Sequence, residues 1–428
     1  MKRMTVLFVI LALVLILVAC GGSDTPVEIP VEAVTEPTLP PPPATATLLP
    51  PPVVSQSGDN EGDTAVSNEE PAAPEAPAVT EPQTLPPWPA TDFGYGAQSH
   101  ATVGDPAYAA DVMKNQLGLD WIKVQLEWPL VQPDPDTYQW FFYDGIVDQA
   151  YEKGLYLMFS VVGAPSWTRA AGLLNRYPGK IQAIEVWNEQ NLDREWAAPD
   201  GISPENYVEF LRQAHDAIKA VDPNVIVISG ALSPTGPGDW VHWADDFEYL
   251  DRALAAGMLN YADCVGFHHN GYNVPPDVRV EDTNSLPEAQ TAVFKGPFTN
   301  QYTGDVLNHL WTFKSTFDGY VERIDAYDAN KKLCVTEFGW ASSEGYDQIP
   351  EGFEFAQDNT LEEQAQYIVQ AFQQMHDSGK VWLAFLFNFD FGNKGNGPTD
   401  DPVPYSIIDT NGAPRPAFGA LAAMEKPR

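Results

Sequence analysis

The sequence predicts a (β/α)8 TIM barrel that follows a long segment outside the fold. Eight short apolar runs recur from about residue 92, amphipathic helical segments lie between them, and the composition changes sharply at the same point. Alternating strands and helices form a parallel sheet, and eight such units close naturally into a barrel. A doubly wound open sheet is the alternative, but no Gly-rich phosphate loop follows the first strand.

The first twenty residues have the features of a targeting segment. Lys2 and Arg3 give a basic start, and the apolar run 6–18 follows, as in a signal peptide. The run ends in Leu17-Val18-Ala19-Cys20, which resembles a bacterial lipoprotein box. The resemblance implies that 1–20 is a lipoprotein signal segment, cleaved before Cys20 so that Cys20 becomes the lipidated N-terminus. It further implies an extracytoplasmic lipoprotein anchored to the cell-surface membrane. An ordinary secretory signal or an uncleaved anchor is the alternative.

Residues 21–91 are predicted to be a disordered, Pro-rich acidic linker. They contain 11 acidic residues and no Lys or Arg, with Pro runs at 40–43 and 50–52. Low hydrophobicity with one sign of charge gives too little burial to offset the entropy of ordering, and Pro stiffens such a chain. The linker would hold the barrel domain, 92–428, away from the membrane.

The barrel segment divides into alternating strands and helices. The apolar runs that predict strands are 92–98, 120–127, 155–163, 183–189, 225–230, 263–270, 332–339 and 381–388. Helical periodicity occupies 106–117, 144–153, 204–221 and 361–378. Ser203 before Pro204 marks one helix start, and Gly379 marks another helix end.

Two long loops interrupt this rhythm, 271–317 after the sixth strand and 340–359 after the seventh. Both fall at the carboxyl ends of strands, where barrel enzymes place their chemistry. Loops of this length are usually functional or disordered. Their aromatic residues favour ordered walls of a cleft.

Charge and cysteine content limit the partners. The net charge is −36, and residues 92–428 hold 48 acidic against 21 basic residues. The resulting negative field repels nucleic acid and disfavours strongly acidic substrates.

Apart from Cys20, only two cysteines occur, Cys264 and Cys334. Strict strand alternation gives Cys264 the parity of His268 and gives Cys334 the parity opposite to Glu337, so we predict two buried free thiols. We expect no metal, no cofactor and no nucleic-acid partner.

Two of the apolar runs end in a glutamate beside tryptophan. The fourth reads Ala183-Ile184-Glu185-Val186-Trp187-Asn188-Glu189, and the seventh ends in Thr336-Glu337-Phe338-Gly339-Trp340. A single such glutamate is more often a surface carboxylate, but a barrel brings these two to one mouth. Glycosidic bond cleavage needs one carboxylic acid to protonate the leaving oxygen and one carboxylate to attack the sugar carbon or activate water. Glu189 and Glu337 are therefore the predicted catalytic pair.

These motifs resemble clan A glycoside hydrolases, most closely families 39 and 5, over about 92–418. Trp187-Asn188-Glu189 is similar to the clan's Asn-Glu signature at strand four, and Thr336–Trp340 is similar to its nucleophile strand. The resemblance implies a retaining mechanism with Glu189 as acid/base, Glu337 as nucleophile and Asn188 on the sugar 2-hydroxyl. The carboxylate separation, which distinguishes retention from inversion, is not fixed by the sequence.

Residues on other strands are candidates for sugar contacts. His268 and Asn270 share the inward face of the sixth strand, and Tyr272 lies beyond them. Relatives often have His-x-Tyr here, so either Asn270 or Tyr272 orients the nucleophile. The alternative for His268 is a core histidine bonded to a neighbour.

The first two strands add three further candidates. Lys123 alternates with apolar neighbours and stands where relatives often place an Arg near the nucleophile. Glu127 is a lesser candidate for a third carboxylate, and His100 is a candidate sugar contact.

Aromatic residues beyond strand ends are candidate platforms, because the C–H face of a pyranose stacks on a ring. They are Trp128, Trp167, Trp340 and Phe387. The clan usually has Trp at the end of strand eight, where this chain has Phe387 followed by Asn388, a further contact candidate. Any one of these rings has core packing as its alternative role.

The sequence therefore predicts a monomeric, lipid-anchored hydrolase of β-linked polysaccharides or oligosaccharides outside the cell. A non-catalytic carbohydrate-binding barrel and a transglycosylase with the same residues are the alternatives. Motifs of serine hydrolases, zinc proteases, P-loop nucleotide binders and EF-hands are absent from the sequence.

Overall fold

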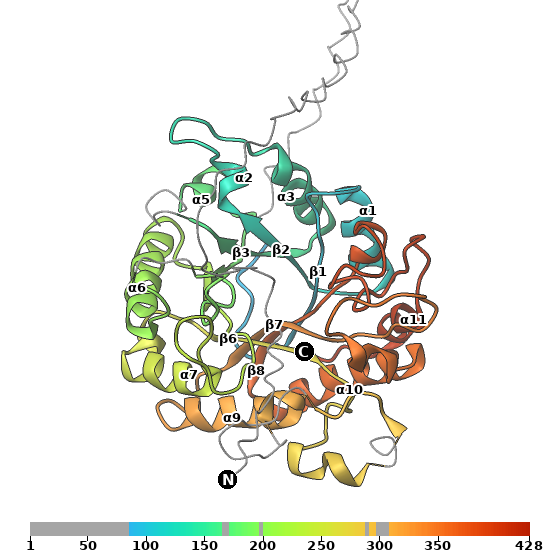
Figure 1. The fold of residues 1–428 in the computed structure, drawn as a ribbon. Helices are drawn as coiled ribbons and strands as arrows, with labels where there is room; N and C mark the ends of the chain where they lie inside the picture. The colour runs from blue at the N-terminus through green and yellow to red at the C-terminus, as the bar shows by residue number, and fades with distance from the viewer. Residues whose placement is uncertain (1–84, 165–170, 197–199, 287–290, 297–307) are drawn as a thin grey trace, which may run out of the picture. The chain divides into compact units, whose positions relative to one another are not determined.

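The computed structural model describes residues 85–164, 171–196, 200–286, 291–296 and 308–428. Within them, eight strands form one parallel sheet in the order β5-β4-β3-β2-β1-β8-β7-β6. A parallel bridge between Ile228 and Cys264 joins the β5 and β6 edges and closes the barrel (Figure 1). The predicted TIM barrel is confirmed. The signal segment, Cys20 and most of the predicted linker lie outside the described residues.

The strands follow the eight apolar runs in order. They are β1 (Gly94–Gln98), β2 (Trp121–Glu127), β3 (Tyr156–Val162), β4 (Ala183–Val186), β5 (Ile226–Ser229), β6 (Val265–Gly271), β7 (Leu333–Trp340) and β8 (Val381–Leu386). The largest difference is in β4, which ends three residues before Glu189 because the chain turns there.

Helices surround the sheet, and none of those described is long and apolar enough to span a bilayer. The α-helices are α1 (Pro106–Asp111), α2 (Trp128–Val131), α3 (Phe141–Lys153), α5 (Gly172–Arg176), α6 (Pro204–Val221), α7 (Asp246–Ala255), α9 (Phe313–Asp325), α10 (Leu361–Ser378) and α11 (Pro416–Ala423). Short 3-10 or π turns lie at 112–116, 258–260, 280–285, 309–311, 354–357 and 391–393. The predicted caps are present: Ser203 accepts from Asn206 N, and Gly379 ends α10 at φ 64°.

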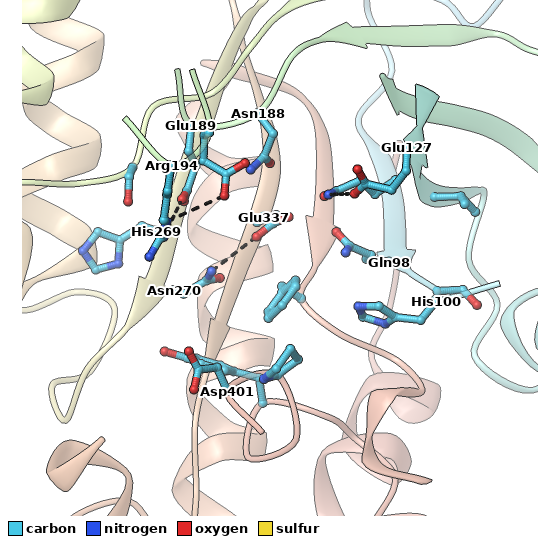
Figure 2. A pocket seen from close by; sticks show the side chains of 18 of the residues that line it. Gln98, His100, Glu127, Asn188, Glu189, Arg194, His269, Asn270, Glu337 and Asp401 are labelled. Carbon is cyan, nitrogen blue, oxygen red and sulfur yellow. Dashed lines mark hydrogen bonds and ion pairs between the residues drawn. The ribbon is translucent and has the colours of Figure 1, made fainter. Parts of the chain in front are cut away.

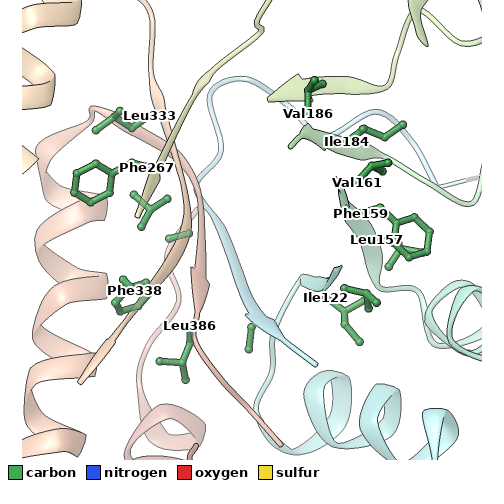
Figure 3. Close-up of a cluster of buried hydrophobic side chains, with 14 of the residues drawn as sticks. Ile122, Leu157, Phe159, Val161, Ile184, Val186, Phe267, Leu333, Phe338 and Leu386 are labelled. Atoms are coloured by element: carbon green, nitrogen blue, oxygen red, sulfur yellow. The ribbon is translucent and has the colours of Figure 1, made fainter. Parts of the chain in front are cut away.

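The core has two layers separated by the strands. Outward-facing residues such as Ile122, Phe159 and Leu386 pack beneath the helices (Figure 3). A smaller cluster fills the barrel interior towards the amino ends of the strands and includes Trp121, Met158 and Phe385. Because this interior is packed, the carboxyl ends of the strands are left for chemistry.

Trp88 corrects the predicted domain boundary. It is 7% exposed and packs edge-on against Trp121 and Tyr156, at the amino ends of β2 and β3. Trp382 Nε1 donates to the carbonyl of Pro89. The last residues of the predicted linker therefore belong to the barrel and cover its amino-end floor. Composition placed them wrongly because one buried aromatic is hidden among Pro-rich neighbours.

The prediction of two free thiols is wrong, because Cys264 and Cys334 form a disulfide with a Cα–Cα distance of 5.7 Å. The pairing of β6 with β7 skips Thr336, a β-bulge that strict alternation does not anticipate. The extra residue reverses the inward–outward alternation of the β7 residues that precede it, relative to that of the residues after it. Cys334 and Glu337 consequently both face the barrel interior, although they are three positions apart.

Candidate active site

A cavity of about 660 Å³ opens at the carboxyl ends of the strands (Figure 2). The two predicted loops border it with Tyr272, Phe353 and Phe355. The segment after β8 adds Asp401 and Tyr405, a wall that sequence analysis did not single out.

Glu189 reaches the cleft through a strained turn at the end of β4. Trp187 and Glu189 have φ angles of 82° and 45°, a left-handed conformation that is costly for residues with a side chain. Trp187 Nε1 donates to the Glu195 carbonyl, and Glu189 N donates to the Ala231 carbonyl. These contacts hold the turn, and the Glu189 carboxylate lines the cleft (Figure 2).

Glu337 enters the same cleft from β7. Its Oε1 accepts a hydrogen bond from Lys123 Nζ at 2.8 Å, and its Oε2 accepts one from Asn270 Nδ2 at 3.3 Å. The residue is 7% exposed. The carboxylate is therefore held from two sides while one edge remains open to a ligand.

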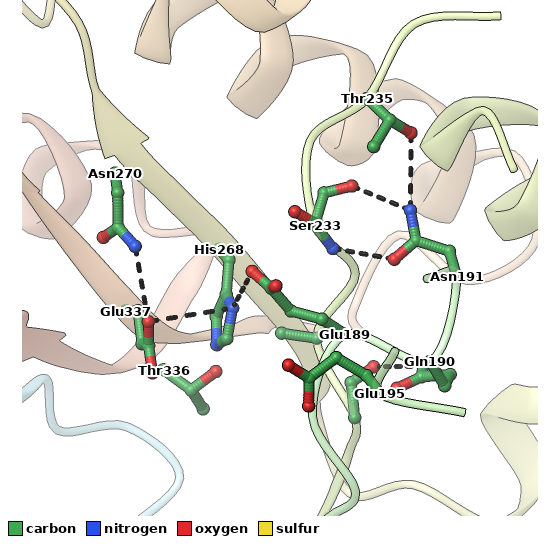
Figure 4. A network of polar contacts seen from close by, with 12 residues as sticks. Glu189, Gln190, Asn191, Glu195, Ser233, Thr235, His268, Asn270, Thr336 and Glu337 are labelled. Atoms are coloured by element: carbon green, nitrogen blue, oxygen red, sulfur yellow. Dashed lines mark hydrogen bonds and ion pairs between the residues drawn. The ribbon is translucent and has the colours of Figure 1, made fainter. Parts of the chain in front are cut away.

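The two carboxylates meet at His268 (Figure 4). His268 Nδ1 lies 3.3 Å from Glu189 Oε1 and 4.0 Å from Glu337 Oε2. The two oxygens therefore lie no farther apart than the sum of these distances, a limit that includes the separation of about 5 Å found in retaining glycosidases. The arrangement places two carboxyl groups within reach of one bond.

The charges around the pair favour an ionised Glu337. Burial alone would raise the pKa of the Glu337 carboxyl, but the charges of Lys123 and His268 and the hydrogen bonds from Lys123 and Asn270 lower it to about 2. Burial lowers the pKa of His268, yet the charge of Glu337 and the contact with Glu189 raise it above its ordinary value. Burial and the charge of Glu189 raise the pKa of Glu195. The surroundings thus favour a charged Glu337 carboxylate next to a His268 ring that holds its proton more tightly than an ordinary histidine.

The structure brings most other predicted contacts to this cleft. Asn188, Asn270, Tyr272 and His100 line it, while Lys123 and His268 contact Glu337 from beneath. Of the two candidates to orient the nucleophile, Asn270 makes the hydrogen bond; Tyr272 stacks on Phe294. Glu127 also lines the cleft and accepts from Gln125 Nε2 at 2.6 Å.

His100 is fixed by the segment after β8. Asp390 Oδ1 accepts from His100 N at 2.9 Å, and Oδ2 accepts from Ser99 Oγ and Lys394 Nζ, each at 2.7 Å. Burial raises the pKa of Asp390, but the hydrogen bond from His100 and the Lys394 charge lower it to about 2. This ionised carboxylate ties the first strand to the last and holds one wall of the cleft.

Three predicted sugar contacts are corrected by the structure. Trp128 and Trp340 are buried in the outer core layer, and both indole N–H groups bond to protein acceptors. Asn388 is fully buried and donates to the Pro402 carbonyl, so it shapes the loop after β8. Proximity to a strand end does not reveal which side of the barrel a side chain faces. Trp167 lies outside the described residues.

Other side chains form the cleft walls. The aromatic ones include Tyr272, Phe353, Phe355, Phe387 and Tyr405, and the polar ones that sequence analysis missed include Gln98, Gln125, Arg194, Glu195 and Asp401. Gln125 shares the parity of Lys123, so strand alternation contained a signal for it. The loop residues have no periodic pattern, and nothing local in the sequence marks them.

No protein-family model and no curated protein matches this chain, but solved structures do. A family 39 glycoside hydrolase from the gut symbiont Bacteroides cellulosilyticus WH2 matches with a TM-score of 0.55 and 17% identity, over 78% of this chain and 64% of that chain. A glucosidase from Croceicoccus marinus gives 0.50 and 15%, over 78% and 65%. A GH5_18 protein from Streptomyces cattleya, solved with Manβ1-4GlcNAc, gives 0.50 and 16%, over 78% and 82%. This chain thus spans less than two thirds of the first two structures, and it shares the barrel fold of clan A glycoside hydrolases.

Proposed function

We propose that this chain is a retaining glycoside hydrolase of β-linked glycans or oligosaccharides, with Glu189 as acid/base and Glu337 as nucleophile. The observation that carries the proposal is the meeting of both carboxylates at His268 Nδ1 within one open cleft, at 3.3 and 4.0 Å. The shared fold of known glycoside hydrolases supports it. The ionised state of Glu337 is the state that a nucleophile needs.

In the first step of the proposed reaction, a Glu337 oxygen forms a bond to the anomeric carbon while the glycosidic C–O bond breaks. The Glu189 carboxylic acid gives its proton to the departing oxygen, which leaves as an alcohol. The hydrogen bonds from Lys123 and Asn270 to Glu337 weaken as the carboxylate loses its negative charge on forming the ester. The product of this step is a glycosyl ester on Glu337 and an ionised Glu189.

In the second step, Glu189 takes a proton from a water molecule whose oxygen attacks the same carbon. The ester bond breaks, Glu337 regains its charge, and the sugar leaves with its original anomeric configuration. Each carboxylate thus returns to its starting state.

The cleft favours neutral sugars. Its aromatic lining suits the C–H faces of a pyranose. Five acidic residues, Glu127, Glu189, Glu195, Glu337 and Asp401, share the lining with Arg194. Their negative field disfavours uronic acids and sulfated sugars.

We place the enzyme outside the cytoplasm, anchored through lipid on Cys20. The Cys264–Cys334 disulfide supports this location, because structural disulfides persist mainly in oxidising compartments. The lipoprotein-like sequence before Cys20 is the second support.

A panel of aryl β-glycosides differing in sugar tests the proposal. We expect turnover of at least one, and loss of kcat on the order of 10⁴-fold or more in Glu337→Gln with ligand binding kept. With Glu189→Ala and a good leaving group, added azide should restore turnover and give a glycosyl azide of retained configuration.

Other results would reassign the protein. An inverted azide product contradicts the acid/base role of Glu189. A wild type that binds glycans but turns over neither the panel nor polysaccharides is a carbohydrate receptor. Sugar transfer to an added acceptor, in place of release to water, identifies a transglycosylase.

A further inference from the structure

Glu185 is a carboxylate beneath the cleft that the proposed reaction does not use. It points into the barrel from β4 and is fully buried. Its Oε1 accepts hydrogen bonds from Thr336 Oγ1 at 2.7 Å and Ala231 N at 3.2 Å, while its Oε2 has no hydrogen-bond partner among the described residues. A buried carboxylate is costly unless positive charge balances it.

Lys123 and His268 supply that positive charge. Lys123 Nζ lies 2.8 Å from Glu337 Oε1 and 3.8 Å from Glu185 Oε2. His268 Nε2 lies 3.9 Å from Glu185 Oε1, and its Nδ1 faces both members of the catalytic pair. Although burial and the charge of Lys123 lower the pKa of His268, the charge of Glu337, the hydrogen bond with Glu189 and the charge of Glu185 together raise it. Two buried carboxyl groups, those of Glu185 and Glu337, therefore face two buried basic side chains.

Glu185 also contacts the bulge that aims Glu337. Thr336 is the extra residue of that bulge, and its hydroxyl is bonded to Glu185. Lys123 Nζ donates to the Thr336 carbonyl at 3.0 Å. The bulge is thus held through its side chain by Glu185 and through its backbone by Lys123. Any shift of this bulge would move the Glu337 carboxylate.

We propose that Glu185 is a positioning residue for the hydrolysis proposed above, on which this inference rests: it fixes Thr336 and Lys123, which aim and hold Glu337, and its negative charge offsets part of the positive charge around the two cleft glutamates. Lys123 and His268 balance Glu185 and Glu337, so the cluster stays neutral when Glu189 is protonated. Without the Glu185 charge the cluster becomes positive, and His268 and Glu189 both lose protons more readily.

Other charged or titratable groups near Glu189 come from its own loop, from β2 and from the loop after β6; they are Arg194, Glu195, Glu127 and Tyr272. Arg194 is 71% exposed, so solvent screens its charge. All four remain in a Glu185 variant. A change between wild type and variant therefore reports the Glu185 charge.

Glu185→Gln tests the proposal because it removes the charge and keeps the shape. We expect the alkaline limb of the kcat/KM pH profile to move to lower pH by about 0.5–1 unit. The NMR titration of the His268 ring, assigned through His268→Gln, should move in the same direction. We expect kcat at the optimum to fall about 10-fold as the bulge loosens.

The matched control is Asp246→Asn. Asp246 is also fully buried and pairs with a histidine, His309, at 3.0 Å, but it lies on α7 outside the cleft. This variant should have a lower free energy of unfolding than wild type. The alkaline limb of its kcat/KM pH profile and its His268 titration should both be unmoved. A role for Glu185 in folding alone predicts the same pattern for both variants.

The outcomes are separable. A folded, active Glu185→Gln with an unmoved limb and an unmoved His268 titration overturns the proposal. If wild type is inactive but the His268 titration still moves in Glu185→Gln, hydrolysis is rejected and the electrostatic coupling of Glu185 to His268 stands.

If Glu185→Gln does not fold, Glu185→Asp carries the test, because it keeps the charge but cannot reach Thr336. We then expect kcat about 10-fold lower with the limb in place, and wild-type kcat would overturn the positioning role.

Discussion

At the scale of single residues, the site depends on how charges share a buried space. Glu337 keeps its charge while nearly buried because Lys123 touches one oxygen and His268 lies near the other. The Lys123 ammonium offers Glu337 a point charge without the planar fork of donors that an Arg would present. This leaves the second oxygen of Glu337 to Asn270, so the carboxylate is held by two different side chains.

The low pKa of Glu337 makes it a source of pH-dependent stability. Its folded-state pKa of about 2 lies below its ordinary value of 4.5. Its ionisation therefore stabilises the folded protein above pH 4.5, and this contribution is lost as the pH falls from about 4.5 to about 2. Comparison with Glu337→Gln isolates the effect, since all other carboxyl groups are common to both proteins.

We expect the free energy of unfolding of wild type, relative to Glu337→Gln, to fall by roughly 2–3 kcal/mol between pH 5 and pH 2. Urea unfolding at several pH values measures this difference, with the exposed variant Glu322→Gln on α9 run in parallel. A difference between wild type and Glu337→Gln that does not change with pH would show that the charges around Glu337 do not stabilise its ionised form.

At the scale of elements, the parts predicted correctly are those encoded locally. The bounds of α6 and α10 follow from Ser203, Pro204 and Gly379, because caps and breakers act within one helical turn. The bulge at Thr336 is different, since register is a property of two paired strands and has no signature in either one alone. The wrong thiol prediction follows from this single missed residue.

The two cleft glutamates show the same division. Glu189 and Glu337 were predicted to line one cleft because each follows an apolar run within a distinctive motif, and both do line it. The other cleft residues come from loops, and Arg194 and Asp401 are brought to the site only by folding. Trp128 and Trp340 were misplaced because sequence proximity to a strand end does not determine the direction of a side chain.

The disulfide between β6 and β7 should contribute measurable stability. It closes a loop of 70 residues, and a loop of this length restricts the unfolded chain by about 2–4 kcal/mol. We expect Cys264→Ala with Cys334→Ala to lower the free energy of unfolding by this amount in urea. Wild type unfolded in the presence of reductant should show the same loss, because the bond is buried until the chain opens. An unchanged urea midpoint in the double variant would contradict a stabilising role.

At the scale of the whole molecule, the barrel has a packed amino-end floor and an open carboxyl-end mouth. Trp88 closes the floor against Trp121 and Tyr156, and the cleft lies at the other end of the strands. Stability and chemistry are thereby separated along the barrel axis. Changes at the floor are expected to alter unfolding without altering the reaction.

Two truncated chains test this separation. A chain that begins at residue 85 keeps Trp88, and one that begins at residue 92 lacks it. We expect the free energy of unfolding of the second chain to be about 3 kcal/mol lower, because the space of a buried tryptophan is left unfilled. Both should have the same kcat at 25 °C on an aryl glycoside. Trp88→Ala within the longer chain is the matched control and should reproduce the loss; equal unfolding midpoints would show that the barrel begins at residue 92.

Arg428, the last residue, lies over the ring of Trp88 at 5.3 Å and pairs with Asp120. Both ends of the described domain thus emerge on the side away from the cleft. A resin bead, a fluorescent tag or a fused protein attached at either end would leave the cleft entrance unobstructed. Immobilised on a solid support in this way, the protein should turn over a soluble aryl glycoside as readily as the free form.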